Sequence, residues 1–246
     1  MSKVEIFNHS MSEIGYTART ATTGDEFKMV QQYILYLEKK YQKLKSKSVA
    51  IFIEPQLDTG YPDIVIVEYN HSLKFELKRE LSINDLKILF HIQKQKSTTT
   101  DSLKAQLGFT DNDIEKTLKN LNQHKLIRMN KANSNIRNVK IRNYCAINKI
   151  ISIEAKIDKW SEAIQQASKN IWFSTESYIL MNKNSCNESI VKKCKESGIG
   201  IILVNGSIKV MLKSEKRAFP VSYSSLLFNE WLQKYDFVKG KTNEHY

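Results

Sequence analysis

The sequence contains few of the residues that interrupt regular structure, with three prolines and eight glycines among 246 residues. Helices and strands must therefore be located from the spacing of apolar residues rather than from turn residues. Hydrophobic residues make up 41% and aromatic residues 10%, which argues against a wholly disordered chain. We expect one large domain or two modest ones from this length.

Cysteine is also scarce. Cys145, Cys186 and Cys194 are odd in number and form no C-x-x-C pair, so neither a disulfide framework nor a zinc knuckle is indicated. The first residues contain no apolar run typical of a signal peptide, and no later stretch is long enough to cross a membrane. These absences predict a cytoplasmic protein with no membrane partner.

Acidic residues are outnumbered, since 26 Asp and Glu stand against 38 Lys and Arg and give a net charge of +12. A protein this basic commonly binds a polyanion, and nucleic acid is the first candidate. The alternative interpretation is that the charge serves solubility alone.

Apolar spacing predicts strands that alternate with helices, which implies an α/β sheet. Residues 150–157 alternate as in a strand, and Trp160, Ala163, Ile164, Ala167 and Ile171 then follow helical spacing. The other expected elements are a helix at 25–44, strands at 48–56, 61–70 and 72–78, and strands and helices from 177 to 237.

Residues 81–145 differ from the rest of the chain. Helices are expected at 81–95, 98–108 and 110–127, followed by a hairpin within 128–147, and this order is typical of a winged helix-turn-helix. We therefore predict an inserted, mainly helical winged-helix domain at 81–145, which splits an α/β domain into residues 1–80 and 146–246.

The inserted segment is strongly basic, with twelve Lys and Arg against five Asp and Glu between Ser82 and Tyr144. Basic hairpins contact DNA phosphates, and the helix before the hairpin can enter the major groove. We expect duplex DNA as the partner; the predicted contacts are Lys116, Lys119, Arg128, Lys131, Arg137, Lys140 and Arg142. Winged helices also serve as protein-docking modules, which is the alternative.

Three charged residues of the α/β part suggest a chemical site. Glu154 and Lys156 are two residues apart and share one face of a strand. Asp63 follows Pro62 at the head of another apolar strand. Carboxylates from neighbouring strands can hold Mg²⁺, and a lysine beside them can stabilise charge on a phosphate. These are the groups that phosphodiester hydrolysis requires.

At Pro62–Asp63 and Glu154–Ala155–Lys156 the chain resembles the PD-(D/E)xK nuclease superfamily, which has the restriction-endonuclease-like fold. The segment after Lys156 is similar to the helix that follows the Glu-x-Lys strand in that superfamily, with Gln166–Ala167 facing the site. The resemblance implies a mixed sheet flanked by helices and a DNA endonuclease in restriction or phage defence. It implies Mg²⁺, with Mn²⁺ as a substitute, as the cofactor.

The roles that the resemblance implies fall on few residues. Asp63, Glu154 and Lys156 would form the catalytic site with help from Gln166, and Asp63, Glu154 and Glu26 would hold the metal. Glu54, close to the hairpin turn, is a further candidate.

Two alternatives stay open. About ninety residues separate Asp63 from Glu154, whereas the superfamily usually has one short hairpin there, and Glu76 and Lys78 lie at the ordinary distance. We prefer Glu154 because the Gln166 helix follows it directly. The second alternative is a catalytically inactive DNA-binding regulator or structural subunit. A homodimer or a partner subunit is compatible with either function.

Overall fold

The computed structural model describes residues 4–19, 23–44, 48–70, 81–130, 135–182, 184 and 186–243, with side chains up to residue 239. The chain divides into two compact units. Unit 1 comprises residues 1–72 and 147–221, and unit 2 comprises residues 73–146 and 222–246. The strand expected at 72–78, with Glu76 and Lys78, lies outside the described residues, as does Lys131.

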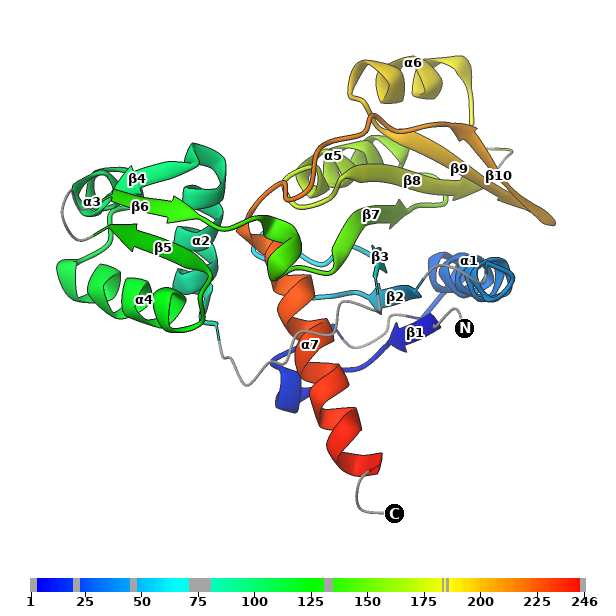
Figure 1. The fold of residues 1–246 in the computed structure, drawn as a ribbon. Helices are drawn as coiled ribbons and strands as arrows, with labels where there is room; N and C mark the ends of the chain where they lie inside the picture. Colours follow the sequence, from blue (N-terminus) through cyan, green and yellow to red (C-terminus); the bar gives the residue numbers. More distant parts are fainter. Residues whose placement is uncertain are drawn as a thin grey trace. The chain divides into compact units, whose positions relative to one another are not determined.

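Unit 1 is a mixed α/β structure around a seven-stranded sheet in the order β1-β2-β3-β7-β8-β9-β10 (Figure 1). β2, β3 and β7 are antiparallel neighbours, whereas β7, β8 and β9 run parallel. The strands are β1 (Val4–Phe7), β2 (Ser48–Ile53), β3 (Ile64–Tyr69), β7 (Ile147–Ala155), β8 (Glu176–Asn182), β9 (Gly200–Asn205) and β10 (Ser207–Leu212).

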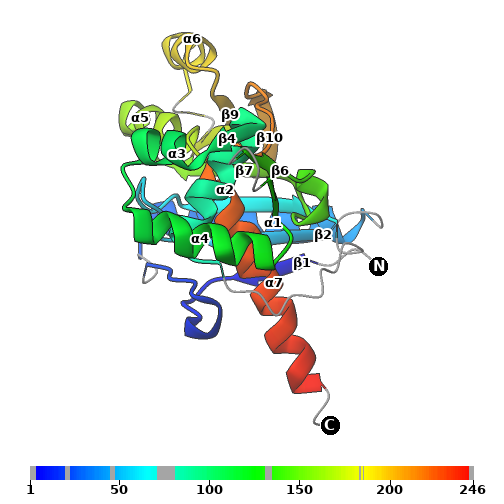
Figure 2. The same ribbon diagram turned by 60° about the vertical axis from the view of Figure 1, so that its left-hand side comes forward.

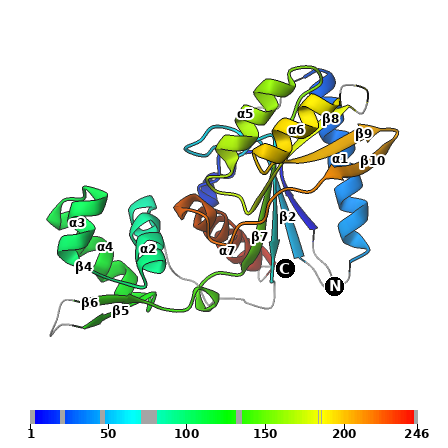
Figure 3. The ribbon, with the colours of Figure 1, turned by 90° about the horizontal axis from the view of Figure 1, so that it is seen from above.

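Helices cover both faces of this sheet (Figure 3). α1 (Asp25–Gln42) packs on one face through Leu37, against Ile51, Ile64 and Ile153 among others. α5 (Trp160–Asn170) and α6 (Glu188–Glu196) pack on the other face with residues such as Ile179 and Ile201. Ile151, Ile153 and Ala155 of β7 belong to the apolar layer under α1. The alternate side chains Ser152 and Glu154 are buried on the other face of the sheet, where each forms side-chain hydrogen bonds.

Unit 2 contains a small sheet in the order β4-β6-β5 with three helices before its hairpin (Figure 2). Its elements are α2 (Ile83–Gln95), β4 (Ser97–Thr99), α3 (Thr100–Leu107), α4 (Asp111–Gln123), β5 (Ile127–Asn130), β6 (Asn135–Asn138) and the 3₁₀ turn η2 (Ile141–Asn143). The Ser82 hydroxyl accepts from the Asp85 N–H at 3.1 Å and caps α2, which lies within the helix expected at 81–95. Residues 97–99 pair with β6 as a strand, whereas helix was expected from 98.

The C-terminal helix α7 (Tyr223–Asn243) belongs to unit 2, although the sequence analysis placed residues 222–246 in the α/β domain. Asn229 accepts a hydrogen bond from the Ala146 N–H at 3.0 Å and donates one to the Tyr144 carbonyl at 3.2 Å. Phe228 and Trp231 are buried. The apolar stripe of a helix predicts that one face is buried, but it does not say against which core.

Within the part of the chain that the structure describes, no helix combines the length and the apolar composition needed to span a membrane.

Candidate active site

Three carboxylates lie in a row across neighbouring strands of unit 1. Ile53 pairs with Ile64, and Ile64 pairs with Ile153. The next positions along these strands are Glu54, Asp63 and Glu154, which follow one another across the same end of the three strands. The Glu54 N–H donates to the Asp63 carbonyl at 3.1 Å, and the Asp63 carboxylate accepts from the Ala155 N–H at 2.6 Å. Strand pairing thus brings Asp63 beside Glu154 across about ninety residues of sequence.

A cleft of about 670 Å³ opens at this end of the strands. Asp63, Glu54, Lys156, Glu26 and Arg19 are among the residues that line it. Glu154 lies behind this lining and is only 4% exposed. With Lys159 also in its lining, the cleft combines carboxylates with three cationic side chains, the combination that binding of a metal-bound phosphate requires.

Glu154 is buried against α5. Its Oε1 atom accepts a hydrogen bond of 2.6 Å from the Asn170 amide. Burial, and secondarily the charge of Asp63, raises the pKa of Glu154 to about 8, although the bonds and charges of Asn170, Lys156 and Arg19 oppose this shift. Glu154 therefore carries a proton at neutral pH unless a further positive charge arrives.

Burial also raises the pKa of Asp63, and the nearby Glu54 carboxylate adds to the rise. The Ala155 N–H and the positive charges of Lys156 and Arg19 act in the opposite direction. Two adjacent buried carboxylates with raised pKa values are a donor set suited to a hard divalent cation, because the cation would replace a proton and relieve the repulsion. Asp63 and Glu154 fit the metal that the resemblance implies.

Lys156 directly follows β7 and is held by two contacts. Its Nζ atom lies 3.1 Å from the Glu26 carboxylate and donates to the Ala155 carbonyl at 3.0 Å. Burial lowers the pKa of Lys156, but the charges of Asp63 and Glu26 outweigh it and raise the pKa overall. Glu26, in the first turn of α1, thus reaches the site through Lys156.

The expected metal set of Asp63, Glu154 and Glu26 is not gathered into one cluster. Among the residues that the structure describes, no three Asp, Glu, His or Cys side chains lie close enough together to surround a metal ion as they stand. Asp63 and Glu154 are neighbours, whereas the Glu26 carboxylate contacts the Lys156 ammonium.

Gln166 lies on the exposed face of α5, whereas Asn170, four residues later, is buried and bonds to Glu154. The structure therefore places Asn170 where Gln166 was expected. The signal was present in the sequence, because Asn170 follows the apolar positions Ala163 and Ala167 at helical spacing.

Arg19 is a residue of the site that was not predicted from the sequence. Its Nε atom lies 2.7 Å from the Glu54 carboxylate, and its guanidinium lies 5.7 Å from the centre of the Tyr61 ring. Glu54 itself has a φ of 46°, a strained conformation for a residue with a side chain, and such strain often occurs at functional sites. The hydrogen bond to Glu54 raises the pKa of Arg19, so the cleft keeps this positive charge at every physiological pH.

The predicted DNA contacts of unit 2 are exposed where they are described. Lys116 and Lys119 lie on α4, and Lys140 and Arg142 lie in and next to η2. Arg128 of β5 pairs directly with Arg137 of β6, so two guanidinium groups share one face of the small sheet.

Comparison with known proteins adds nothing to this geometry, because no protein-family model, curated protein or solved structure matches the chain.

Proposed function

We propose that the protein is a metal-dependent DNA endonuclease of the PD-(D/E)xK type. The observation that carries the proposal is the pairing of Asp63 with Glu154 at the same end of their strands, with Lys156 next to them. The order β2, β3, β7 and α5 also supports it, since the resemblance expects an Asp strand, a neighbouring Glu-x-Lys strand and a helix directly after it.

Different residues of the site would bind the metal, stabilise charge and position the catalytic groups. Asp63 and Glu154 would hold Mg²⁺ or Mn²⁺, which supplies activation of water and neutralisation of phosphate charge. Lys156 presents a positive charge to the cleft and can stabilise the charge that develops on the scissile phosphate. Glu26 orients Lys156, and Asn170 fixes the Glu154 carboxylate. Arg19 offers a second cation to the phosphate backbone.

Unit 2 would supply affinity for duplex DNA. Its three helices before a hairpin keep the order predicted for a winged helix, with the additional short strand β4 after the first helix. Like charges placed directly opposite on neighbouring strands destabilise a sheet. The Arg128–Arg137 pair therefore favours an anionic ligand, and a phosphate between the two groups would remove the repulsion.

The test is cleavage of supercoiled plasmid DNA in Mg²⁺ or Mn²⁺, with EDTA as the metal-free control. Asp63→Asn and Glu154→Gln should each abolish cleavage while DNA binding persists or tightens, because each change removes negative charge. Lys156→Ala should slow cleavage by a factor on the order of 10² to 10³. Gln166→Ala is the matched control on the exposed face of α5 and should cut normally.

A second control addresses the alternative pair. A protein with Glu76→Ala and Lys78→Ala should cut nearly as well as the wild type. If this protein is inactive while Glu154→Gln still cuts, Glu76 and Lys78 form the site and the assignment of Glu154 is wrong.

The second candidate is a DNA-binding regulator or structural subunit without catalysis. Two features of the site favour it. Lys156 is paired with Glu26, and Glu26, the third carboxylate of the expected metal set, is not clustered with Asp63 and Glu154. Salt-sensitive DNA binding without cleavage in either metal would select this function.

A further inference from the structure

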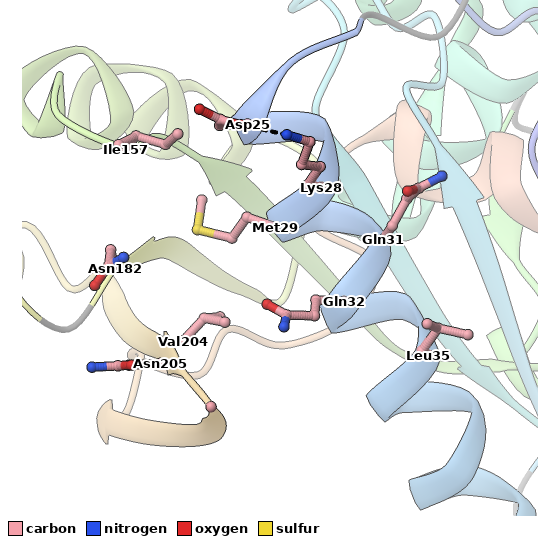
Figure 4. Close-up of a pocket in the computed structure, with 11 residues that line it drawn as sticks. Asp25, Lys28, Met29, Gln31, Gln32, Leu35, Ile157, Asn182, Val204 and Asn205 are labelled. Carbon is pink, nitrogen blue, oxygen red and sulfur yellow. Dashed lines mark hydrogen bonds and ion pairs between the residues drawn. The ribbon is translucent and has the colours of Figure 1, made fainter.

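A second hollow of unit 1 adjoins the carboxylate cleft. It has a volume of about 720 Å³ and lies between α1 and the ends of β8 and β9 (Figure 4). Asp25 and Ile157 line both hollows, so the two lie next to each other. We call this second hollow the amide groove, defined by Gln32, Asn182 and Asn205 with Met29, Val204 and Ile157.

The amide groove has an apolar floor and a polar rim. Met29 and Val204 are 8% and 6% exposed, and Ile157 is partly buried beside them. The amides of Gln32, Asn182 and Asn205 are exposed along the rim. Figure 4 shows Met29 and Gln32 extending from α1 toward Val204 and Asn205.

The charge of the groove is nearly balanced. Asp25 and Lys28, the charged residues of its lining, bind each other at 2.8 Å (Figure 4). With one cation and one anion, this lining has no net positive charge with which to attract phosphates. Side-chain amides instead offer a donor and an acceptor side by side, which matches the edges of bases, and an apolar floor suits the methyl group of thymine or a base face.

We propose that the amide groove reads the bases of DNA next to the scissile phosphate, and that cleavage consequently depends on base sequence. The inference rests on the proposed nuclease function, because the position next to the carboxylate cleft is what places these bases beside the cut. Phosphate contacts in unit 2 then supply affinity, and the groove supplies discrimination.

The test compares wild-type protein with Gln32→Ala combined with Asn205→Ala. Gln42→Ala is the matched control, since Gln42 is an exposed glutamine at the end of the same helix. Each protein cuts a pool of duplexes with random sequence in Mg²⁺, and the bases flanking the cut ends are sequenced. The same variants in an Asp63→Asn background are used to select bound duplexes, so that preference is also measured without cleavage.

We expect wild-type protein and the Gln42 variant to share a preference at a few positions. The double variant should lose about tenfold or more of that preference, while its affinity for the unselected pool changes by less than about twofold because phosphate contacts dominate affinity. Melting curves of all variants should coincide, since the replaced side chains are exposed.

The outcomes separate this inference from the nuclease proposal. Cleavage with an unchanged preference, or with no preference in any protein, overturns the groove assignment and leaves the nuclease standing. A groove-dependent preference in the binding selection without cleavage supports the groove and overturns the nuclease. Neither binding nor cleavage by the wild type overturns both.

Discussion

Replacing Glu154 by glutamine should stabilise unit 1 at alkaline pH even as it abolishes the proposed activity. Glu154 is 4% exposed, and burial next to Asp63 raises its pKa from 4.5 to about 8. The folded protein therefore binds more protons at this position than the unfolded chain does between those two pH values. Its free energy of unfolding falls as pH rises through that window. Glutamine has nothing to ionise there, and its carbonyl can still accept the Asn170 hydrogen bond.

The size of this stabilisation follows from the difference between the folded and unfolded pKa values of Glu154. Each pKa unit corresponds to about 1.4 kcal/mol, so the advantage of the variant should be near zero at about pH 4.5 and about 3 kcal/mol at pH 7. Above about pH 8 it should reach at most about 5 kcal/mol, because Asp63 can take up part of the same proton.

Urea unfolding followed by tryptophan fluorescence measures this difference. Trp160 and Trp172 lie in unit 1, whereas Trp231 lies in unit 2, so a Trp231→Phe background restricts the signal to unit 1. Mg²⁺ at about pH 8 should stabilise the wild type more than the variant, because ligands that bind only the folded state stabilise it. A difference between the two proteins that is the same at about pH 5 and about pH 8.5 would refute the reasoning.

Three further predictions concern other contacts. Replacing both Arg128 and Arg137 with alanine should weaken binding to all duplexes alike and reduce the slope of log affinity against log salt concentration by about two. Fluorescence anisotropy measures this, with a Lys192→Ala, Lys195→Ala protein as the control in unit 1. An unchanged slope would indicate a protein partner instead. Asn170→Ala should lower the free energy of unfolding by about 1–3 kcal/mol, because the buried Glu154 carboxyl loses its amide donor; an unaltered melting temperature would show that this bond contributes nothing. A fragment of residues 73–146 alone should show a broad thermal transition by circular dichroism, because α7 supplies Phe228 and Trp231 to the core of unit 2. Joining residues 222–246 to this fragment through a flexible linker should restore a sharp transition. A sharp transition of the short fragment would contradict this prediction.

Local structure could be predicted from the sequence where burial leaves a periodic signal. β2 and β3 lie within the predicted strands at 48–56 and 61–70, and α1 begins at the predicted residue Asp25. Apolar spacing reports which face of an element is buried, and that is a property of a few consecutive residues.

Contacts between distant residues left no such signal. Arg19 pairs with Glu54 across 35 positions, and nothing in the residues around Arg19 names its partner. Strands and helices were expected from 177 to 237, yet the assignment of α7 to unit 2 depends on the Asn229 bonds to Tyr144 and Ala146. The side-by-side positions of Asp63 and Glu154 follow from β3–β7 pairing, which only the resemblance to a nuclease superfamily suggested.

The division of the chain has a consequence for the order of folding. The chain passes from unit 1 to unit 2 after residue 72, returns after 146 and leaves again after 221. β3 must wait for β7 before the centre of the large sheet can close, and this long separation makes the closing step slow. The core of unit 2, in turn, stays incomplete until α7 has been synthesised, after every strand of unit 1. During synthesis, the apolar surface of residues 83–127 should therefore stay exposed until the last helix has been made, which makes this segment a candidate for chaperone binding.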